Sequence, residues 1–529
     1  MITLLDYGAG NVRSVRNAIR KLGFEVRDAA NAEDILTADK LIFPGVGSFG
    51  LVMSQLQHDG YIEPLQRRIS ENRSFLGICV ALQAFFEGSE ETPGVAGLGI
   101  IKGQVRRFSD PHLSVPHIGW NSIKLSKHCS LFNDYQEEKL YFVHSYHGSS
   151  KDVPEQWKLA ATDYGEEFAS AICYGNVAAF QFHPEKSGMA GLSILRRFLE
   201  DDEIRVSTDV SRKTIVKTEL AKRVIACLDV RSNDNGDLVV TKGDQYDVRE
   251  EGEVRNLGKP VELAHRYFNE GADEITFLNI TGFRDFPLTD QPMLNVLKLT
   301  SEKVFVPLTI GGGIREFTDS KGIFHSALDV ASEYFRSGAD KISIGSDAVY
   351  AAENFIGAQE ADGGSSIEKI SRVYGAQAVV ISVDPRRIYV NSPDDTPHRT
   401  IKTNYPGPAG ETYCWYQCTV KGGREGRDLD VIQLITACEK LGAGEILLNC
   451  IDKDGTNSGF DIELINHVKT FSTIPVIASS GAGSAQHFQE VFNETEAEAA
   501  LAAGIFHRQE VELFSVKDTL AESNIVIRR

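Results

Sequence analysis

The sequence predicts an α/β protein with two domains, an N-terminal open sheet and a C-terminal (β/α)8 barrel of the TIM type. Three observations support this prediction. The chain of 529 residues is longer than one hydrophobic core usually serves. Over roughly the first 200 residues, short apolar strands alternate with amphipathic helices. In the rest of the chain, one series of elements occurs twice in the same order, which predicts a barrel built by duplication.

Composition and charge exclude several classes of function. The chain is 42% hydrophobic and 24% charged, and its net charge of −19 argues against nonspecific binding to nucleic acid or to an anionic membrane. It has no apolar run long enough to span a bilayer and no targeting pattern at its N-terminus. Its eight cysteines lack the paired spacing of zinc ligands. We therefore expect a soluble, cytoplasmic protein with reduced thiols, no metal and no cofactor.

The N-terminal domain begins with two predicted strands, residues 2–6 and 40–43, around a predicted helix over residues 12–22. The second strand ends at Pro44-Gly45-Val46-Gly47. Ligands of open α/β sheets bind beyond the carboxyl ends of the strands. Glycines there let a peptide N–H approach a developing oxyanion, although an ordinary loop would have the same sequence.

Cys79 follows a predicted strand, residues 74–78, and precedes a predicted helix, whose N-terminus would favour the reactive thiolate. A lone cysteine is more often a buried apolar residue, so the sequence must supply partners. A later strand, residues 177–182, ends at His183, and Glu185 follows. A histidine base beside the cysteine and a carboxylate that orients its ring would complete a catalytic triad.

With Gly77-Ile-Cys-Val-Ala-Leu-Gln83 and His183-Pro-Glu185, residues 1–203 resemble the class I, or triad, glutamine amidotransferases. The resemblance implies that Cys79 attacks the carboxamide of L-glutamine, that His183 moves the proton and that Glu185 holds His183. Glutamate and ammonia would be released. It further implies a glutamine and oxyanion site at Gly45, Val46, Gly47, Gln83, Ser145 and Tyr146.

Other stretches refine this resemblance. Residues 116–121 and 141–146 resemble the amidotransferase subfamily that serves histidine biosynthesis. One position departs from the family, which usually has glycine where this chain has Ala81. The additional methyl is expected either to fit the first helical turn or to tighten the glutamine pocket.

Residues 204–221 are polar, lack an apolar stripe and are predicted to be a linker, so that the second domain covers residues 222–529. In this domain, residues 223–229 and 379–384 are apolar runs that each end in aspartate. Their continuous apolar character is typical of strands buried on both faces. Further matched pairs are 271–275 with 442–446, 306–313 with 474–481, and 339–345 with 497–503. Four strand–helix units, duplicated, predict the eight-stranded barrel.

The duplication also locates the predicted chemistry. Asp229 and Asp384 close the first and fifth strands, so both should face the mouth of the barrel, where such enzymes bind substrate. Two carboxylates there suit general acid and base catalysis, but an inherited helix cap would also place aspartates at these positions. Small residues follow corresponding strands in both halves, and their backbone N–H groups would bind a phosphate at each end of a substrate.

The barrel resembles the cyclase part of the imidazole glycerol phosphate synthase family, through residues 225–230, 306–314 and 451–456. With the amidotransferase in front, the chain resembles the fused, eukaryotic form. The resemblance implies a bisphosphorylated substrate, phosphoribulosyl-formimino-AICAR phosphate, converted to imidazole glycerol phosphate and AICAR. Asp229 and Asp384 would be the acid–base pair. Substrate or phosphate contacts are expected at Lys242 (on a mobile lid), Gly313, Gly345, Ser346, Asp454, Gly455, Ser480, Gly481, Ala503 and Gly504.

Charged residues at the starts of barrel strands suggest how the domains cooperate. The resemblance makes four of them a salt-bridged ammonia gate, although surface charges near strand starts would give the same pattern: Arg223, Glu274, Lys341 and Glu445. Lys186 and Asp340 are expected to pair across the domain interface. We expect a monomeric, bifunctional chain whose partners are small molecules, with no nucleic acid and no membrane.

Other functions fit the sequence less well. A barrel–amidotransferase pair that makes pyridoxal phosphate would need lysines that form Schiff bases with sugar phosphates. A related isomerase with a duplicated barrel would need no source of ammonia. A non-enzymatic scaffold or nitrogen sensor would require that Ala81 disables the glutaminase. Two insertions, residues 354–366 and 391–412, have no role that the sequence indicates.

Overall fold

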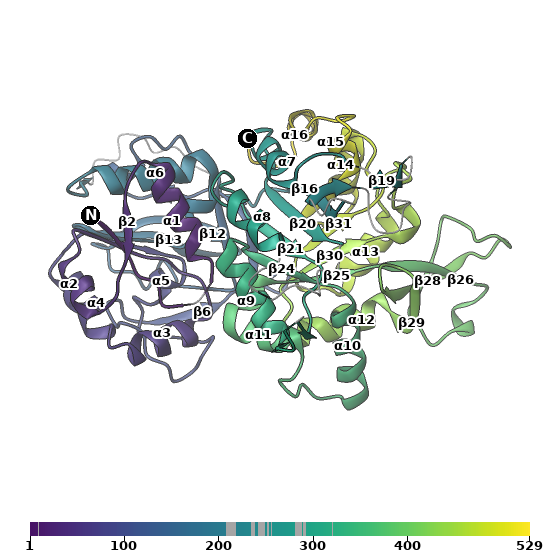
Figure 1. Ribbon diagram of the computed structural model, residues 1–529, viewed down its shortest axis with the longest axis horizontal. Coiled ribbons are helices and arrows are strands. Elements are labelled where there is room, and N and C mark those ends of the chain that lie inside the picture. Colours follow the sequence, from purple (N-terminus) through teal and green to yellow (C-terminus); the bar gives the residue numbers. More distant parts are fainter. Residues whose placement is uncertain are drawn as a thin grey trace.

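The computed structural model describes residues 1–8, 10–207, 218–233, 238–241, 249–250, 253–254, 256–280, 288, 292–319 and 321–529. Figure 1 shows the two predicted parts side by side, with the N-terminal domain on the left and the barrel on the right. Within the described ranges, no helix is long and apolar enough to cross a membrane.

The N-terminal domain is built on the predicted open α/β sheet. Five strands are parallel, and three antiparallel strands extend the sheet beyond β14. β1 and β14 end two residues before the predicted ends, because the chain leaves the sheet there to form the loops at its carboxyl edge. In spatial order the strands are β2 (Val26–Asp28), β1 (Ile2–Leu4), β3 (Lys40–Phe43), β4 (Phe75–Ile78), β14 (Val177–Phe180), β13 (Glu166–Tyr174), β12 (Lys158–Tyr164) and β8 (Lys124–Leu125).

Helices cover both faces of this sheet, and each face has its own apolar core. One core contains side chains of α1 (Val12–Lys21) and α6 (Gly188–Glu200). The other contains side chains of α2 (Ala32–Thr37), α3 (Phe49–His58) and α4 (Ile62–Ser70). The sheet is therefore buried on both sides, which explains the continuous apolar runs in its central strands.

Two antiparallel strands, β7 (His117–Asn121) and β10 (Leu140–His144), lie between the sheet and the barrel. Ile118, Trp120 and Tyr141 from this pair belong to the same apolar core as the barrel. Small strands complete the domain: β5 (Gly88–Ser89), β6 (Gln104–Arg107), β11 (Tyr146–His147), β9 (His128–Cys129) and β15 (Val206–Ser207). β15 pairs with β9, so the first described part of the predicted linker lies against the N-terminal domain.

The C-terminal domain confirms the predicted barrel. Eight parallel strands follow one another in sequence order, and β16 pairs with β32 to close the ring. They are β16 (Arg223–Ser232), β20 (Glu274–Asn279), β21 (Leu308–Gly311), β24 (Lys341–Ile344), β25 (Val379–Val383), β30 (Glu445–Asn449), β31 (Val476–Ser479) and β32 (Ala499–Ala502). Helices surround them: α7 (Pro260–Asn269), α8 (Pro292–Thr300), α9 (Ala327–Ser337), α10 (Ser346–Ala358), α11 (Ser366–Tyr374), α12 (Val431–Leu441), α13 (Ile462–Phe471), α14 (Ala485–Glu494), α15 (Gly504–His507) and α16 (Leu513–Glu522).

Three expectations about barrel segments need correction. β16 does not end at Asp229 but continues to Ser232, because it pairs there with β17 (Leu238–Thr241). Of the insertion at 354–366, residues 354–358 are the end of α10 and Ser366 begins α11, so the connection between the two helices is residues 359–365. The insertion at 391–412 contributes β27 (Thr400–Lys402) to an antiparallel sheet with β26 (Pro385–Val390), β28 (Tyr413–Val420) and β29 (Glu425–Asp430). This sheet projects from the barrel, away from the N-terminal domain (Figure 1).

Candidate active sites of the two domains

Cys79 occupies the expected turn between β4 and α5 (Val80–Gln83). Its φ of 51° lies in the left-handed region, which a residue with a side chain adopts only when the surrounding fold enforces it. The Cys79 N–H donates to the carbonyl of Phe180 at 2.6 Å, which ties the turn to β14. The side chain is largely buried, and it lies at the carboxyl edge of the sheet, where the sequence placed it.

His183 and Glu185 complete the predicted group. The His183 Nδ1 lies 2.8 Å from the Glu185 Oε1, and both side chains are buried. Burial disfavours the charged imidazolium, but the Glu185 carboxylate and the Cys79 sulfur outweigh it and raise the pKa of His183 well above its usual value.

The surroundings of Cys79 include the predicted Gln83 and Tyr146 and one residue that was not predicted, Gln181. The Gln83 Nε2 donates to the carbonyl of Tyr146 at 2.8 Å and lies 3.3 Å from the Gln181 Oε1. The Gln181 Nε2 in turn lies 3.4 Å from the Cys79 sulfur. Gln181 was not predicted, although it precedes the histidine motif by only two residues. Ser145, which was predicted, is buried directly before Tyr146.

Two buried imidazoles, those of His144 and His117, hold the carbonyl of Tyr146 in place. The His144 Nδ1 lies 2.8 Å from the carbonyl of Tyr146, so this nitrogen carries the hydrogen. The His144 Nε2 must then accept from the His117 Nδ1, which lies 3.2 Å away. Burial lowers the pKa of both histidines, that of His117 to about 3, so both rings stay neutral. The two rings thus fix the carbonyl that holds Gln83.

The loop at Gly45 and Val46 lies against the cysteine turn, as expected. A Cβ at position 45 would come within 1.6 Å of the carbonyl oxygen of Ile78, so only glycine fits this approach. The Val46 N–H, however, donates to the Tyr7 hydroxyl at 2.9 Å. The N–H expected to face an oxyanion is therefore engaged by a tyrosine in this conformation. Gly47 has a φ of 114°, which its role in the turn requires.

The methyl of Ala81 faces the core. Ala81 is fully buried in the same apolar cluster as the β4 side of the sheet. A Cβ added at Gly77 would lie 3.2 Å from the Ala81 Cβ and 3.1 Å from the Ala179 Cβ. The absence of a side chain at Gly77 thus leaves room for the Ala81 methyl in the apolar core.

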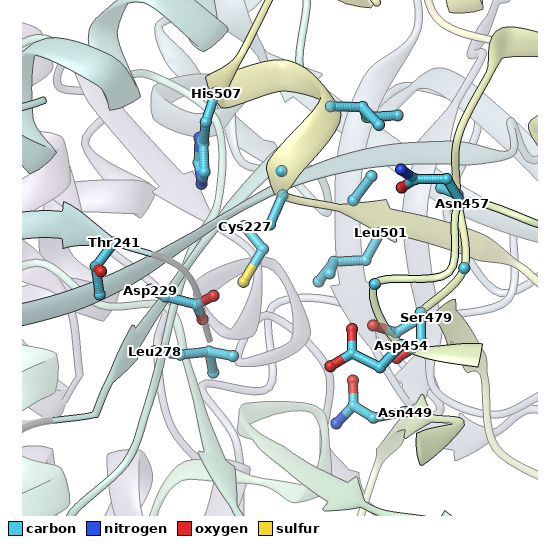
Figure 2. A pocket seen from close by; sticks show the side chains of 18 of the residues that line it. Cys227, Asp229, Thr241, Leu278, Asn449, Asp454, Asn457, Ser479, Leu501 and His507 are labelled. Carbon is cyan, nitrogen blue, oxygen red and sulfur yellow. The ribbon is translucent and has the colours of Figure 1, made fainter. Parts of the chain in front are cut away.

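The second candidate site is a cavity of about 550 Å³ at the mouth of the barrel. Asp229 and Asp384 both line it, on the first and fifth of the eight strands. Figure 2 shows Asp229 on one side, with Asp454 and Asn449 across from it. A mostly enclosed cavity with a few convergent polar groups is the usual form of a small-molecule site.

The environment of Asp384 favours its protonated form. Burial raises the pKa of Asp384, and the nearby Asp454 carboxylate adds to the increase. A hydrogen bond of 2.8 Å from the Asn449 Nδ2 to the Asp384 Oδ1 opposes this shift, because it stabilises the charged form. Asn449 also donates to the Ser382 hydroxyl at 3.0 Å, so its amide is held in one orientation.

The predicted phosphate contacts do not all reach this cavity. Among the described residues, six of them line it: Asp454, Gly455, Ser480, Gly481, Ala503 and Gly504. Gly313, Gly345 and Ser346 are not part of that lining, and the Ser346 hydroxyl instead accepts the backbone N–H of Lys421 at 2.9 Å. Lys242 lies outside the described residues. Of the predicted contacts that the structure describes, those in the second half of the barrel line the cavity and those in the first half do not.

Comparison with known proteins identifies the families of the two parts of the chain. The chain matches the family described as "Glutamine amidotransferase class-I" over residues 3–201 and the one described as "Histidine biosynthesis protein" over residues 223–512. It is 59% identical to the chloroplastic imidazole glycerol phosphate synthase hisHF of Arabidopsis thaliana, over 100% of this chain and 89% of that protein. It is 56% identical to imidazole glycerol phosphate synthase hisHF of Schizosaccharomyces pombe, over 100% of both chains. The chain belongs to the imidazole glycerol phosphate synthase family.

The barrel alone also resembles separate proteins of the family. It is 41% identical to imidazole glycerol phosphate synthase subunit HisF of Methanopyrus kandleri, over 59% of this chain and 99% of that subunit. The chain therefore joins in one polypeptide a part that exists elsewhere in the family as a subunit.

Four charged side chains form a closed ring at the lower end of the barrel. Arg223, Glu274, Lys341 and Glu445 begin β16, β20, β24 and β30, and all four are fully buried. Arg223 contacts Glu274 at 2.9 Å and Glu445 at 2.5 Å, and Lys341 contacts them at 2.7 Å and 2.5 Å. Burial alone would raise the pKa of Glu445, but the two cations outweigh it and lower this pKa. The ring separates the barrel interior from the N-terminal domain.

Tyr141 connects this ring to the triad. Its carbonyl accepts the His183 N–H at 2.9 Å. Its side chain is buried, and Glu274 and Glu445 are among the charges that help to raise its pKa. One residue of β10 thus contacts the glutaminase site through its backbone and faces the lower end of the barrel with its ring.

Polar contacts hold the domains together beside the triad. The Lys186 Nζ lies 2.6 Å from the Asp340 Oδ2, and the Asn11 Nδ2 donates to the Asp340 Oδ1 at 2.7 Å. The Ser48 hydroxyl, next to the oxyanion loop, donates to the carbonyl of Arg372 at 3.0 Å. At the other side, the indole of Trp120 donates to the carbonyl of Asp273, and the Arg528 guanidinium lies 4.2 Å from the Trp120 ring centre.

The residues that the sequence analysis missed gave weak signals. Asn449 is a polar residue that ends a barrel strand, as Asp384 follows one, and could have been found in this way. Tyr7 and Asn11 lie in the loop after the first strand, at the edge where ligands were expected. Among the described residues, no cluster of histidine, cysteine and acidic side chains could hold a metal ion.

Proposed function

We propose that this chain hydrolyses glutamine to glutamate and ammonia at Cys79. The ammonia passes through the barrel and reacts there with phosphoribulosyl-formimino-AICAR phosphate, which yields imidazole glycerol phosphate and AICAR. The chain would thus serve histidine biosynthesis and return AICAR for purine synthesis. The observation that carries this proposal is the placement of Tyr141: its carbonyl accepts the His183 N–H, and its buried side chain lies near enough to the charged ring for Glu274, Arg223 and Glu445 to shift its pKa.

At the glutaminase site, the Cys79 thiolate attacks the carboxamide carbon of glutamine. His183, held by Glu185, gives its proton to the departing nitrogen, which leaves as ammonia. His183 then accepts a proton from the water that hydrolyses the thioester. The oxyanion of each step would be stabilised by the Val46 N–H once it leaves the Tyr7 hydroxyl.

At the mouth of the barrel, ammonia adds to the ketone of the substrate, whose oxygen leaves as water. Asp384 suits the general acid, because its raised pKa keeps a proton available, and Asp229 suits the general base. Ring closure and cleavage release the two products. The six predicted phosphate contacts that line the cavity would hold one phosphate of the substrate.

Direct transfer between the sites would keep ammonia in its unprotonated, nucleophilic form. Ammonia in neutral water is mostly protonated, and ammonium cannot attack a ketone. The ring of Arg223, Glu274, Lys341 and Glu445 would act as the gate that ammonia passes on its way into the barrel. Lys186 and Asp340 would hold the two domains in register while it opens.

The test is a synthesis assay with purified protein, the bisphosphate substrate and either glutamine or an ammonium salt. We expect product from both nitrogen sources with the native chain. We expect Cys79→Ala to lower glutamine-dependent synthesis by at least about a thousandfold and to leave ammonium-dependent synthesis intact. Failure of the native chain to make product from either source would refute the cyclase assignment.

We also propose that the chain is a cytoplasmic monomer. All eight cysteines are buried, unpaired thiols, as is usual in a reducing compartment. One relative is named chloroplastic, so imaging of the tagged full-length protein in its own cells is the decisive measurement of location. Analytical ultracentrifugation tests the monomer, since a dimer would sediment at twice the mass of 58.2 kDa.

A further inference from the structure

His507 is a polar residue of the barrel cavity to which the proposed function assigns no role. It lies at the end of α15, which follows the last barrel strand, and it lines the cavity. Its side chain is only 7% exposed, and within the described part of the chain its Nε2 has no hydrogen-bond partner. Figure 2 shows the imidazole pointing from α15 into the cavity on the side of Asp229. A buried polar atom without a partner costs stability, so its retention needs an explanation.

The neighbouring tyrosine determines which ring nitrogen carries the hydrogen. The Tyr267 hydroxyl lies 2.5 Å from the His507 Nδ1, and the Arg266 guanidinium lies 4.7 Å from the centre of the Tyr267 ring. We assign the hydroxyl as the donor in this short contact, which leaves the hydrogen of the neutral ring on the Nε2. Burial lowers the pKa of His507 to about 3, and the Arg266 and Arg508 cations add to this shift, so the ring is neutral.

The internal duplication shows that the fold does not need this polar pair. Ala503 corresponds to Gly345 in the first half, so His507 corresponds to Val349. Gly442 corresponds to Gly271, so Tyr267 corresponds to Cys438. Val349 and Cys438 are both buried, which shows that the same place in the other half is filled without a histidine–tyrosine pair. A role in packing alone would not require the polar residues.

We infer that the His507 Nε2–H is a substrate contact that donates to an anionic oxygen of the bisphosphate substrate. This inference rests on the proposed function, and it deepens it by naming a residue that orients the substrate. The contact would lie at the end of the cavity formed by Ser480, Gly481, Ala503 and Gly504. This hydrogen bond would distinguish the two phosphate ends of the substrate, because Val349, the counterpart of His507 in the first half of the barrel, offers no donor.

Two substitutions separate this role from a structural one. His507→Gln places an amide N–H near the position of the Nε2, and so keeps a donor in the cavity. His507→Asn places its amide near the Nδ1, where it can still bond Tyr267 but cannot reach the cavity. With saturating ammonium, we expect His507→Asn to raise KM for the bisphosphate substrate at least about tenfold and His507→Gln to change it less than about threefold. We expect kcat and the melting temperature to differ little between the two variants.

The Tyr267 contact provides an independent measurement. Tyr267→Phe removes the hydroxyl that fixes the tautomer, so KM should rise severalfold in the native background. In the His507→Gln background it should have no further effect, because the glutamine donor does not depend on a tautomer. Val349→Ala, at the related position, is the control and should leave KM unchanged.

Three results would overturn the inference while the native chain remains active: an unchanged KM in His507→Asn, an equal rise in His507→Gln, or additive effects of Tyr267→Phe and His507→Gln. If the native chain made no product with ammonium, the proposed function would fall, and this inference would fall with it.

Discussion

At the scale of single residues, both candidate sites depend on atoms held in positions that cost free energy. Cys79 adopts a φ of 51°, and Gly45 approaches the carbonyl of Ile78 more closely than any other residue could. Asp384 is a buried carboxyl next to a second acid. Such costs persist only where the surrounding structure enforces them, and here they coincide with the atoms that would react.

The contact between Tyr7 and Val46 predicts low glutaminase activity in this conformation. Tyr7→Phe removes the acceptor of the Val46 N–H, so this group is freed to face the substrate oxyanion. We expect glutaminase activity in the absence of the barrel substrate to rise about three- to tenfold. Glutamate release, measured alone, checks this. A fall in activity would mean that the hydroxyl holds the loop in its productive shape instead.

The raised pKa of Asp384 predicts the pH dependence of the cyclase. A general acid is active while protonated, so activity is lost as pH rises through its pKa. Asn449→Ala removes the hydrogen bond that stabilises the charged form, which raises this pKa further. The basic limb of kcat should therefore move to higher pH. The assay must hold the concentration of free ammonia constant at each pH, and a limb that moved to lower pH would contradict the assignment of Asp384 as the acid.

At the scale of elements, β7 and β10 form the structural link between the sites. Trp120 and Tyr141 face the barrel, while His117 and His144 of the same two strands support the carbonyl that binds Gln83. A displacement of the strand pair at its barrel end would therefore also move the Tyr146 carbonyl that binds Gln83, because the hydrogen bonds between the two antiparallel strands couple their positions.

The link predicts different effects for two substitutions of His144. His144→Asn keeps an N–H near the position of the Nδ1 and can still donate to the carbonyl of Tyr146, whereas His144→Gln cannot. We expect the glutamine variant to raise KM for glutamine about tenfold and the asparagine variant to raise it much less. Steady-state kinetics of glutamate release gives both values. Equal effects in the two variants would assign His144 a role in packing alone.

The elements also show what can be predicted from sequence. The triad and the two aspartates could be predicted because each lies next to a strand with a short, recognisable motif. The barrel was correctly predicted because its duplication repeats the order of elements. Tyr7, Gln181 and His507 were missed, because their importance comes from contacts with segments far away in the chain. The end of β16 was placed too early, because its extension depends on pairing with β17 rather than on its own residues.

At the scale of the whole molecule, the two domains are joined by contacts on both sides of the proposed ammonia route. Lys186, Asp340 and Asn11 lie beside the triad, and Trp120, Asp273 and Arg528 lie beside the first barrel strand. Between them, the buried ion pairs of Arg223, Glu274, Lys341 and Glu445 lie at the lower end of the barrel. Coupled synthesis should then depend on the alignment of the domains as much as on either site.

This alignment is tested by removal of the Asp340 carboxylate. Asp340→Ala leaves the buried Lys186 ammonium without its partner and removes one of the hydrogen-bond acceptors of the Asn11 amide. We expect glutamine-dependent synthesis to fall about tenfold or more, while ammonium-dependent synthesis survives. Asp340→Asn, which keeps the shape and removes the charge, measures how much of the effect is electrostatic. Equal loss of both activities would show that Asp340 supports the barrel fold rather than the coupling.

The interface has a further consequence for the connection between the domains. Its contacts come from the two folded bodies themselves, from Asn11 and Ser48 on one side to Asp340 and Arg372 on the other. The covalent joint therefore acts as a tether, which keeps each domain at an effective concentration in the millimolar range around its partner. Fusion would then secure equal numbers of the two halves and rapid reassociation after each separation, whereas recognition between them is encoded in surfaces that two separate chains could equally carry.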